Sequence, residues 1–180
     1  MTGEKGKARR LPSRDECIEL LREHGCGEDV IAHSLAVASL AVRIARKCEA
    51  DVDLVEAGAL LHDLGRCKSH GIDHAVRGAE VAKELKLPDQ VVRIVERHIG
   101  GGIDRAEAKK LGLPVKDYTP ETLEEKIVSH ADNLIAGTKR TTVKEAVGWL
   151  VRQGLADAAM KVLKLHEDLS AKCGMNLDDI

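Results

Sequence analysis

Histidine and aspartate side chains interrupt apolar stretches that otherwise resemble buried helix faces. Asp63 lies within the core-like segment 57–65, where burial of an unpaired carboxylate would be strongly unfavourable. Taken singly, a histidine on an apolar face is more often a hydrogen-bonded core residue than a ligand, and an adjacent His-Asp pair can form a salt bridge at a helix end. Recurrence on successive expected helices favours one shared site instead. The residues concerned are His33, His62, Asp63, His74, His98 and Asp132.

The side-chain types in this set indicate which metals such a site would hold. Imidazole and carboxylate ligands together suit divalent Fe, Mn, Co, Ni or Zn. Because no cysteine belongs to the set, a structural zinc site is disfavoured. The residues therefore predict a site for a divalent metal that takes nitrogen and oxygen ligands.

The order of these residues resembles the pattern of the HD superfamily, in which a histidine is followed by a His-Asp doublet and then by a distant aspartate. Those positions here are His33, His62-Asp63 and Asp132. The doublet lies in the stretch L-H-D-L-G-R, which is similar to the H-D-I-G-K form common in that family. The resemblance covers about residues 30–137 and implies the helical bundle of the HD type.

Two further histidines match the subset of the family that holds two metals. His74 opens the stretch H-A-V-R-G-A, which is similar to an H-x3-G-A pattern, and His98 precedes a glycine-rich turn. His70 is an alternative to His74, but it falls in an expected loop and lacks the G-A context. The segment 125–132, E-K-I-V-S-H-A-D, resembles the E-K-I-x-x-x-A-D stretch of the symmetrical diadenosine-tetraphosphatase branch. The resemblance thus implies six ligands and two ions.

The activity that the resemblance implies is metal-dependent cleavage of a phosphate ester or anhydride, with a nucleotide as the expected small-molecule partner. A hydroxide that bridges the metals would attack phosphorus. Asp63 would orient this nucleophile, and Arg66, which stands where many members have lysine, would offset charge on the phosphoryl oxygens. The loop 100–119 is longer than the matching turn of the branch just named, which leaves the substrate open. Substrate contacts are expected from Arg66, Arg105 and Lys109, with Lys116 and Tyr118 as further candidates.

Three alternatives stay open at this point. Some HD proteins with the same six-ligand pattern resemble mixed-valence di-iron oxygenases. A one-metal 5′-nucleotidase would use only the ligands His33, His62, Asp63 and Asp132. A non-catalytic HD module would bind a nucleotide without turning it over.

Helix signals recur along the chain and strand signals are missing, which predicts an all-α single domain. Segment 28–48 is the most apolar and is expected at the centre of the fold. Thr119-Pro120 would start a helix that runs to Gly137. Capping boxes would start three others, at Ser13/Glu16, Asp53/Glu56 and Thr142/Glu145. The expected helices span residues 13–25, 28–48, 53–64, 73–87, 89–99, 104–111, 119–137, 142–154 and 155–172, and Gly174 is expected to close the last one. His130 is expected to pack in the core or beside the ligands, and His24 and His166 are expected at the surface.

Length and composition fit one globular domain. We place it at residues 13–180, with the core motif region at 30–137 and C-terminal helices at 142–174, after a flexible basic tail at 1–12. That tail lacks the apolar region of a signal peptide, and no stretch is apolar enough to span a membrane. The net charge of −2, with no Phe, one Trp and one Tyr, gives no strong signal for nucleic-acid binding. Five scattered cysteines without a C-x-x-C pair predict reduced thiols in a cytoplasmic protein.

Overall fold

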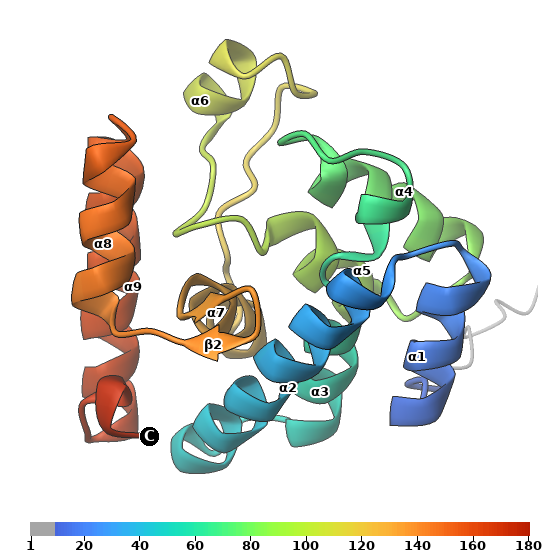
Figure 1. Ribbon diagram of the computed structural model, residues 1–180, viewed down its shortest axis with the longest axis horizontal. Coiled ribbons are helices and arrows are strands. Elements are labelled where there is room, and N and C mark those ends of the chain that lie inside the picture. Colours follow the sequence, from blue (N-terminus) through green and yellow to red (C-terminus); the bar gives the residue numbers. More distant parts are fainter. Residues whose placement is uncertain (1–9) are drawn as a thin grey trace, which may run out of the picture.

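Helices dominate the computed structural model, which describes residues 10–180 (Figure 1). The α-helices are α1 (Arg14–Glu23), α2 (Glu28–Cys48), α3 (Val52–Leu61), α4 (His74–Glu84), α5 (Asp89–Arg97), α6 (Arg105–Lys110), α7 (Leu123–Asn133), α8 (Val143–Arg152) and α9 (Ala156–Cys173). Two 3-10 helices, η1 (Leu64–Cys67) and η2 (Leu177–Asp179), and two short strands, β1 (Ile135–Ala136) and β2 (Lys139–Arg140), complete the described elements. The predicted all-α class is confirmed.

Helix α2 lies at the centre of the fold, as its apolar sequence predicts. Its residues Val37, Ala41 and Ile44 have no exposed surface. Helices α3 and α7 pack along it, and α5 packs on α3 and α7. Because the chain has no Phe, small and branched aliphatic side chains fill this core. Helix α4 packs on α5 at one edge of this core (Figure 1).

Helices α8 and α9 form an antiparallel pair at one side of this core (Figure 1). Helix α9 packs against α7 and α2, and α8 packs against α9. The side chains of Val162 and Leu169 are buried in this contact. Gly174 ends α9 in the left-handed region with φ 69°, as the sequence predicts.

Local capping signals locate most helix starts. The capping boxes at Ser13 and Thr142 are both present. The expected cap at Asp53 is wrong, because Asp51 Oδ1 accepts a hydrogen bond from Leu54 N at 3.0 Å and α3 begins at Val52. Two aspartates two residues apart compete for the same role, and the one in the extended conformation fills it.

Helix α7 is shorter at both ends than the sequence predicts. Thr122, not Thr119-Pro120, is its N-cap, and the helix ends at Asn133 instead of Gly137. The chain then enters an antiparallel hairpin in which Ile135 pairs with Arg140. Gly137 turns this hairpin with φ 62°, a conformation that favours glycine. The hairpin was not expected, because a strand of two residues is too short to show the alternation of apolar and polar residues that predicts a strand.

A disulfide joins Cys48 at the end of α2 to Cys173 at the end of α9. Their Cα atoms are 4.5 Å apart although 125 positions separate them in the sequence. The expectation of reduced thiols throughout is therefore wrong for this pair. Cys17, Cys26 and Cys67 are free thiols.

Residues 1–9 of the expected basic tail lie outside the described part of the chain. The described residue Arg10 forms an ion pair with Glu16 of α1. Among the described helices, none combines the length and apolar character needed to cross a membrane.

Candidate metal centre

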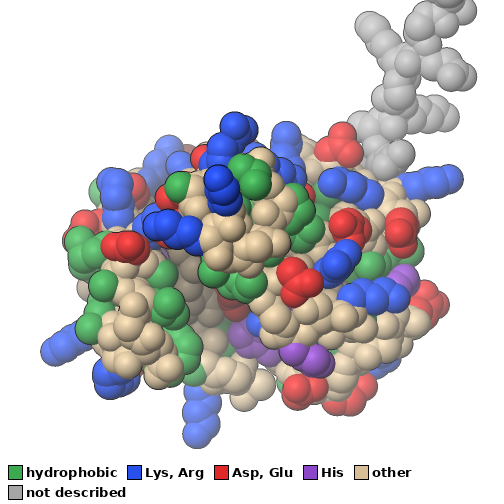
Figure 2. All heavy atoms as spheres, turned by 90° about the horizontal axis from the view of Figure 1, so that it is seen from above, with side chains coloured by type: hydrophobic (Ala, Val, Ile, Leu, Met, Phe, Trp, Pro, Cys, Tyr) green, Lys and Arg blue, Asp and Glu red, His purple; other side chains and the backbone are tan. Residues whose placement is uncertain are grey.

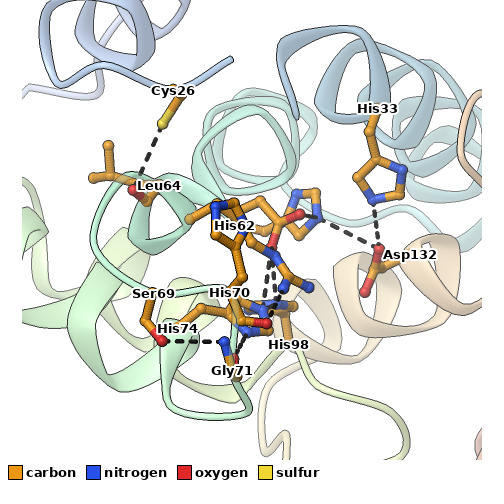
Figure 3. Close-up of polar contacts among 12 residues, drawn as sticks. Cys26, His33, His62, Leu64, Ser69, His70, Gly71, His74, His98 and Asp132 are labelled. Atoms are coloured by element: carbon orange, nitrogen blue, oxygen red, sulfur yellow. Dashed lines mark hydrogen bonds and ion pairs between the residues drawn. The ribbon is translucent and has the colours of Figure 1, made fainter. Parts of the chain in front are cut away.

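The six residues singled out in the sequence come together in one cluster. Figure 3 labels five of them, His33, His62, His74, His98 and Asp132. His33 lies in the first half of α2 and Asp132 near the end of α7. The other four lie at helix boundaries: His62 caps the C-terminus of α3, Asp63 precedes η1, His74 opens α4 and His98 caps the C-terminus of α5. The sequence suggested that Asp63 lies inside a helix. It lies instead where the chain changes from α3 to η1, which frees its carboxylate to face the cluster.

The first half of the cluster joins α2, α3 and α7. His33 Nε2 lies 2.9 Å from Asp132 Oδ1, and His62 Nε2 lies 3.4 Å from the same oxygen. One ligand atom from each of these three residues lies within 4.8 Å of the other two. This half therefore presents two imidazole nitrogens and one carboxylate oxygen to a common point.

The second half joins η1, α4 and α5. His74 Nε2 lies 3.1 Å from Asp63 Oδ1, and His98 Nε2 lies 3.7 Å from the same oxygen. His62 connects the two halves, because its Nε2 also lies 3.7 Å from Asp63 Oδ2. The six residues thus form one continuous cluster that could hold two neighbouring cations.

Backbone carbonyls fix the orientation of all four imidazole rings. The Nδ1–H of His62, His74 and His98 donates to the carbonyl three residues earlier, at 2.7, 2.8 and 2.8 Å. His33 Nδ1 donates to Gly137 O at 2.7 Å, across the hairpin that follows α7. A carbonyl oxygen can only accept, so each Nδ1 carries a hydrogen, and in the neutral imidazole each Nε2 keeps its lone pair. This is how metal-binding histidines are held.

Burial and neighbouring charges move the pKa values of these groups apart. Burial raises the pKa of Asp63, but the imidazoles of His62 and His74 outweigh it and hold the pKa far below its usual range. Burial opposes protonation of His62, yet Asp63 and Asp132 raise its pKa to about 9. Burial, followed by the charge on His62, lowers the pKa of His98 to about 4. The two carboxylates therefore stabilise positive charge in the cluster, and a divalent cation held by these residues would take the place of the proton on His62.

Two contacts in the cluster fit a divalent cation better than they fit a closed protein core. Nε2 of His62 is buried and has no hydrogen-bond partner. Nε2 of His74 faces Nε2 of His98 at 3.0 Å, although both atoms are acceptors when Nδ1 carries the hydrogen. A cation among these nitrogens would satisfy all three lone pairs. The residues present thus fit divalent metal.

Two glycines let η1 and α4 approach closely enough to form the second half. A Cβ on Gly65 would collide with the carbonyl of His74 and would lie 2.5 Å from Gly78 N. A Cβ on Gly78 would lie 2.8 Å from Val95 Cγ1 and 2.9 Å from Gly65 N. These are the glycines of the H-D-L-G and H-x3-G-A stretches, so both motifs have a steric explanation.

Arg66 stands at the rim of a cavity of about 370 Å³ beside the cluster. Its Nε donates to Asp63 Oδ1 at 3.1 Å and its Nη1 donates to His70 O at 3.0 Å. His33 and Asp63 also line this cavity. His70 is exposed at the same rim and makes none of the Nε2 contacts of the buried His74, which agrees with the choice of His74.

The loop between α5 and α7 contributes less than the sequence suggested. Tyr118 is buried, and its hydroxyl donates to Pro114 O at 2.9 Å. Lys116 forms an ion pair with Glu96 at 2.5 Å. Arg105 and Lys109 are exposed on α6 and do not line the 370 Å³ cavity, so their contact with substrate stays a prediction.

A second pair of buried histidines lies outside the cluster. The sequence suggested that His166 is on the surface, but it is 7% exposed and its Nδ1 lies 3.2 Å from His130 Nε2. His166 Nε2 donates to Asn176 Oδ1 at 3.1 Å. The sequence signal was present, because His166 shares a helix face with the buried residues Val162 and Leu169. His130 packs α7 against α9, as the sequence predicts.

Known proteins resemble this chain both in sequence and in fold. The HD domain family matches residues 30–137. The HD domain of the phosphodiesterase PgpH from L. monocytogenes, in complex with cyclic-di-AMP, has a similar structure, with a TM-score of 0.56 and 19% identity over 86% of this chain and 93% of that one. At this identity the likeness concerns the fold.

Two relatives are more similar in sequence. A tRNA (cytidine(56)-2′-O)-methyltransferase from Picrophilus torridus is 49% identical over 94% of this chain and 50% of its own length. An uncharacterised protein from Methanocaldococcus jannaschii is 52% identical over 68% of this chain and 75% of its own length. This chain spans about half the length of the methyltransferases it matches.

Proposed function

The chain belongs to the HD domain family, and on that premise we propose that it is a two-metal phosphohydrolase that cleaves a phosphate ester or anhydride of a nucleotide. Metal-dependent phosphohydrolase chemistry suits the family, the helical fold and the cluster of histidines and carboxylates. The proposal adds the number of ions, the six ligands and the substrate class.

One observation carries the proposal. Four imidazoles, each with Nδ1–H held by a backbone carbonyl, direct Nε2 toward the two carboxylates Asp63 and Asp132. A structural ion pair would need one such histidine, whereas four nitrogens and two carboxylates supply ligands for two cations. In the proposed ligand set, His33, His62 and Asp132 hold one ion, and Asp63, His74 and His98 hold the other. His62 and Asp63 lie between them.

The chain's own residues then have defined tasks. Divalent ions bound here would supply an acidified water as the nucleophile and would polarise the phosphoryl oxygen. Asp63 orients the reacting groups, because it lies between the two halves of the cluster. Arg66 is held on Asp63 at the rim of the cavity, so its guanidinium can offset charge that develops on the phosphoryl oxygens.

The cavity beside the cluster favours a nucleotide-sized substrate. Its volume of about 370 Å³ falls in the range of small-molecule sites. The PgpH domain was seen with cyclic-di-AMP, and the Picrophilus relative is named for an action on tRNA. We therefore include cyclic dinucleotides and short RNA among the substrates to be screened, beside mononucleotides and dinucleoside polyphosphates.

The test compares wild type with Asp63→Asn on that panel, with release of phosphate or nucleotide as the readout. The substitution keeps the shape of the side chain and removes its charge. We expect turnover to fall by about 100-fold or more, together with loss of bound metal. Asp157→Asn, on the exposed start of α9, is the matched control and should leave both unchanged. Equal turnover by Asp63→Asn and wild type would refute the assigned site.

A further inference from the structure

A second cavity, of about 420 Å³, adjoins Asp132. Asp132 and Ile135 of the α7–β1 segment line one wall, and Ala146, Trp149 and Leu150 of α8 line the other. Figure 2 shows a hollow between the histidine side chains and the hydrophobic side chains over α8 and α9. We call this second cavity the Trp149 pocket.

Trp149 is an unusual surface residue in this chain. It is the only Trp, the chain has no Phe, and the single Tyr is buried. The Trp149 side chain is 54% exposed at the edge of the pocket, so α8 does not use it to pack on α9. An indole that is open to solvent beside an apolar wall offers a flat π surface to a ligand.

The Trp149 pocket shares one residue, Asp132, with the proposed metal centre. Asp132 lines the pocket, and its Oδ1 lies 2.9 Å from His33 Nε2. His33 in turn lines the 370 Å³ cavity with Asp63 and Arg66. A ligand with a phosphate at the cluster therefore has an apolar pocket beside Asp132, one of the two carboxylates of the cluster.

We propose that the Trp149 pocket binds the nucleobase of the substrate by stacking on the Trp149 indole, while the phosphate lies at the metal cluster. This inference rests on the proposed function, because it assumes a phosphorylated substrate at the cluster. Trp149 lies on α8, outside the residues 30–137 that the HD domain matches, whereas Asp132 and Ile135 of the other wall lie within them.

One polar group that lines the pocket already has partners within α8 and its cap. The carboxylate of Glu145 lines the pocket, but its Oε2 accepts from Thr142 N at 2.8 Å and from Thr142 Oγ1 at 3.0 Å. That oxygen is thus occupied by the capping box of α8. Stacking tolerates every base because each has a π face, so we expect purines and pyrimidines to bind, with purines tighter because their ring area is larger.

Intrinsic fluorescence tests the proposal directly, because all tryptophan emission comes from Trp149. Wild type is titrated with adenosine 5′-monophosphate, and with ribose 5-phosphate as the probe that lacks a base. We expect quenching by the nucleotide and none by the sugar phosphate. Equal quenching by both, or no quenching by the nucleotide, would overturn the proposal.

Equilibrium dialysis of variants supplies the second readout. Trp149→Ala should lower the ratio of adenosine 5′-monophosphate affinity to ribose 5-phosphate affinity by roughly 5- to 150-fold. Trp149→Phe should restore most of that ratio. Val151→Ala, a 55% exposed position on α8 that does not line the pocket, is the control and should leave the ratio unchanged.

Failure of this inference is separable from failure of the proposed function. If wild type hydrolyses nucleotides and Trp149→Ala keeps the wild-type affinity ratio, the Trp149 pocket is not the base site and the phosphohydrolase proposal stands. If wild type hydrolyses no phosphate ester but Trp149 still responds to the nucleotide alone, the base site stands and the proposed activity fails.

Discussion

Nε2 of His74 lies 3.0 Å from Nε2 of His98, and each ring gives its Nδ1–H to a backbone carbonyl. Two imidazole acceptors face each other in a buried place. That contact is repulsive unless a proton or a cation lies between the two nitrogens. The relationship therefore supports the second ion of the proposed function, beside the one that His33, His62 and Asp132 would hold.

Metal content tests this second ion. His74→Ala and His98→Ala should each lower the bound metal from about two ions toward one per chain, as measured by mass spectrometry of the metals. His70→Ala, at the exposed rim of the cavity, should leave the stoichiometry unchanged. Loss of an ion in His70→Ala but not in His74→Ala would mean that His70, and not His74, is the ligand. A single ion in wild type would favour the one-metal nucleotidase.

Gly65 should tolerate no side chain. In Gly65→Ala the new Cβ meets the backbone of His74 and Gly78, which cannot rotate away. We expect a loss of roughly 1–3 kcal/mol in the free energy of unfolding, with weaker binding of the second ion, because η1 has to separate from α4.

Gly148→Ala is the control for that experiment. Its Cβ meets only the flexible end of Arg152, at 3.4 Å, within helix α8. We expect no loss of stability and a gain of up to about 1 kcal/mol, since alanine is the better helix former. Equal stability of Gly65→Ala and Gly148→Ala would contradict the close approach of η1 and α4.

Glu125 should be the most important carboxylate for stability outside the cluster. The Glu125 side chain is 2% exposed, and it accepts hydrogen bonds from Arg97 Nη1 at 3.1 Å and from Glu121 N at 2.8 Å. The bond from Arg97 joins α5 to α7. Glu125→Leu should cost roughly 3 kcal/mol in urea unfolding, because Arg97 loses its buried partner. Glu121→Gln removes the exposed partner of the same arginine and should cost less than about 1 kcal/mol. Equal losses in the free energy of unfolding for the two variants would contradict the importance assigned to Glu125.

The Cys48–Cys173 disulfide should stabilise the packing of α9 on α2. Closing a loop between positions 125 apart removes entropy from the unfolded chain equivalent to roughly 4–5 kcal/mol. Reduction should therefore lower the Tm of wild type, and Cys48→Ser should show the lower Tm without reductant. Cys67→Ser, at a free thiol, should keep the response to reductant. A Tm of wild type that reductant does not change would contradict the disulfide.

Sequence alone could predict the structural features that depend on residues close together in the chain. The capping boxes at Ser13 and Thr142 and the apolar face of α2 are local signals, and the structure has all three. The metal cluster could be predicted as a set because each member interrupts an apolar face. The sequence could not indicate that Asp63 lies past the end of α3. The 3-10 helix that follows Asp63 packs closely against α4 through Gly65, and this tertiary contact leaves no local pattern.

Features that depend on distant pairs could not be predicted in this way. Nothing near Cys48 indicates that Cys173 lies beside it, because that contact requires α9 to fold back along α2. His166 was misplaced for a related reason: its partner His130 is 36 residues away on another helix. The role of Trp149 depends on a pocket between two segments, which no local pattern contains.

In the proposed function, this cluster hydrolyses a phosphate ester with oxygen from water. The most direct measurement is anaerobic turnover of the nucleotide panel by manganese-loaded protein in ¹⁸O-water, with Asp63→Asn beside wild type. We predict product release by wild type without dioxygen, with one ¹⁸O atom in the phosphate for each bond cleaved. Turnover that requires dioxygen, with no phosphate release from any member of the panel, would contradict the claim and favour the oxygenase alternative.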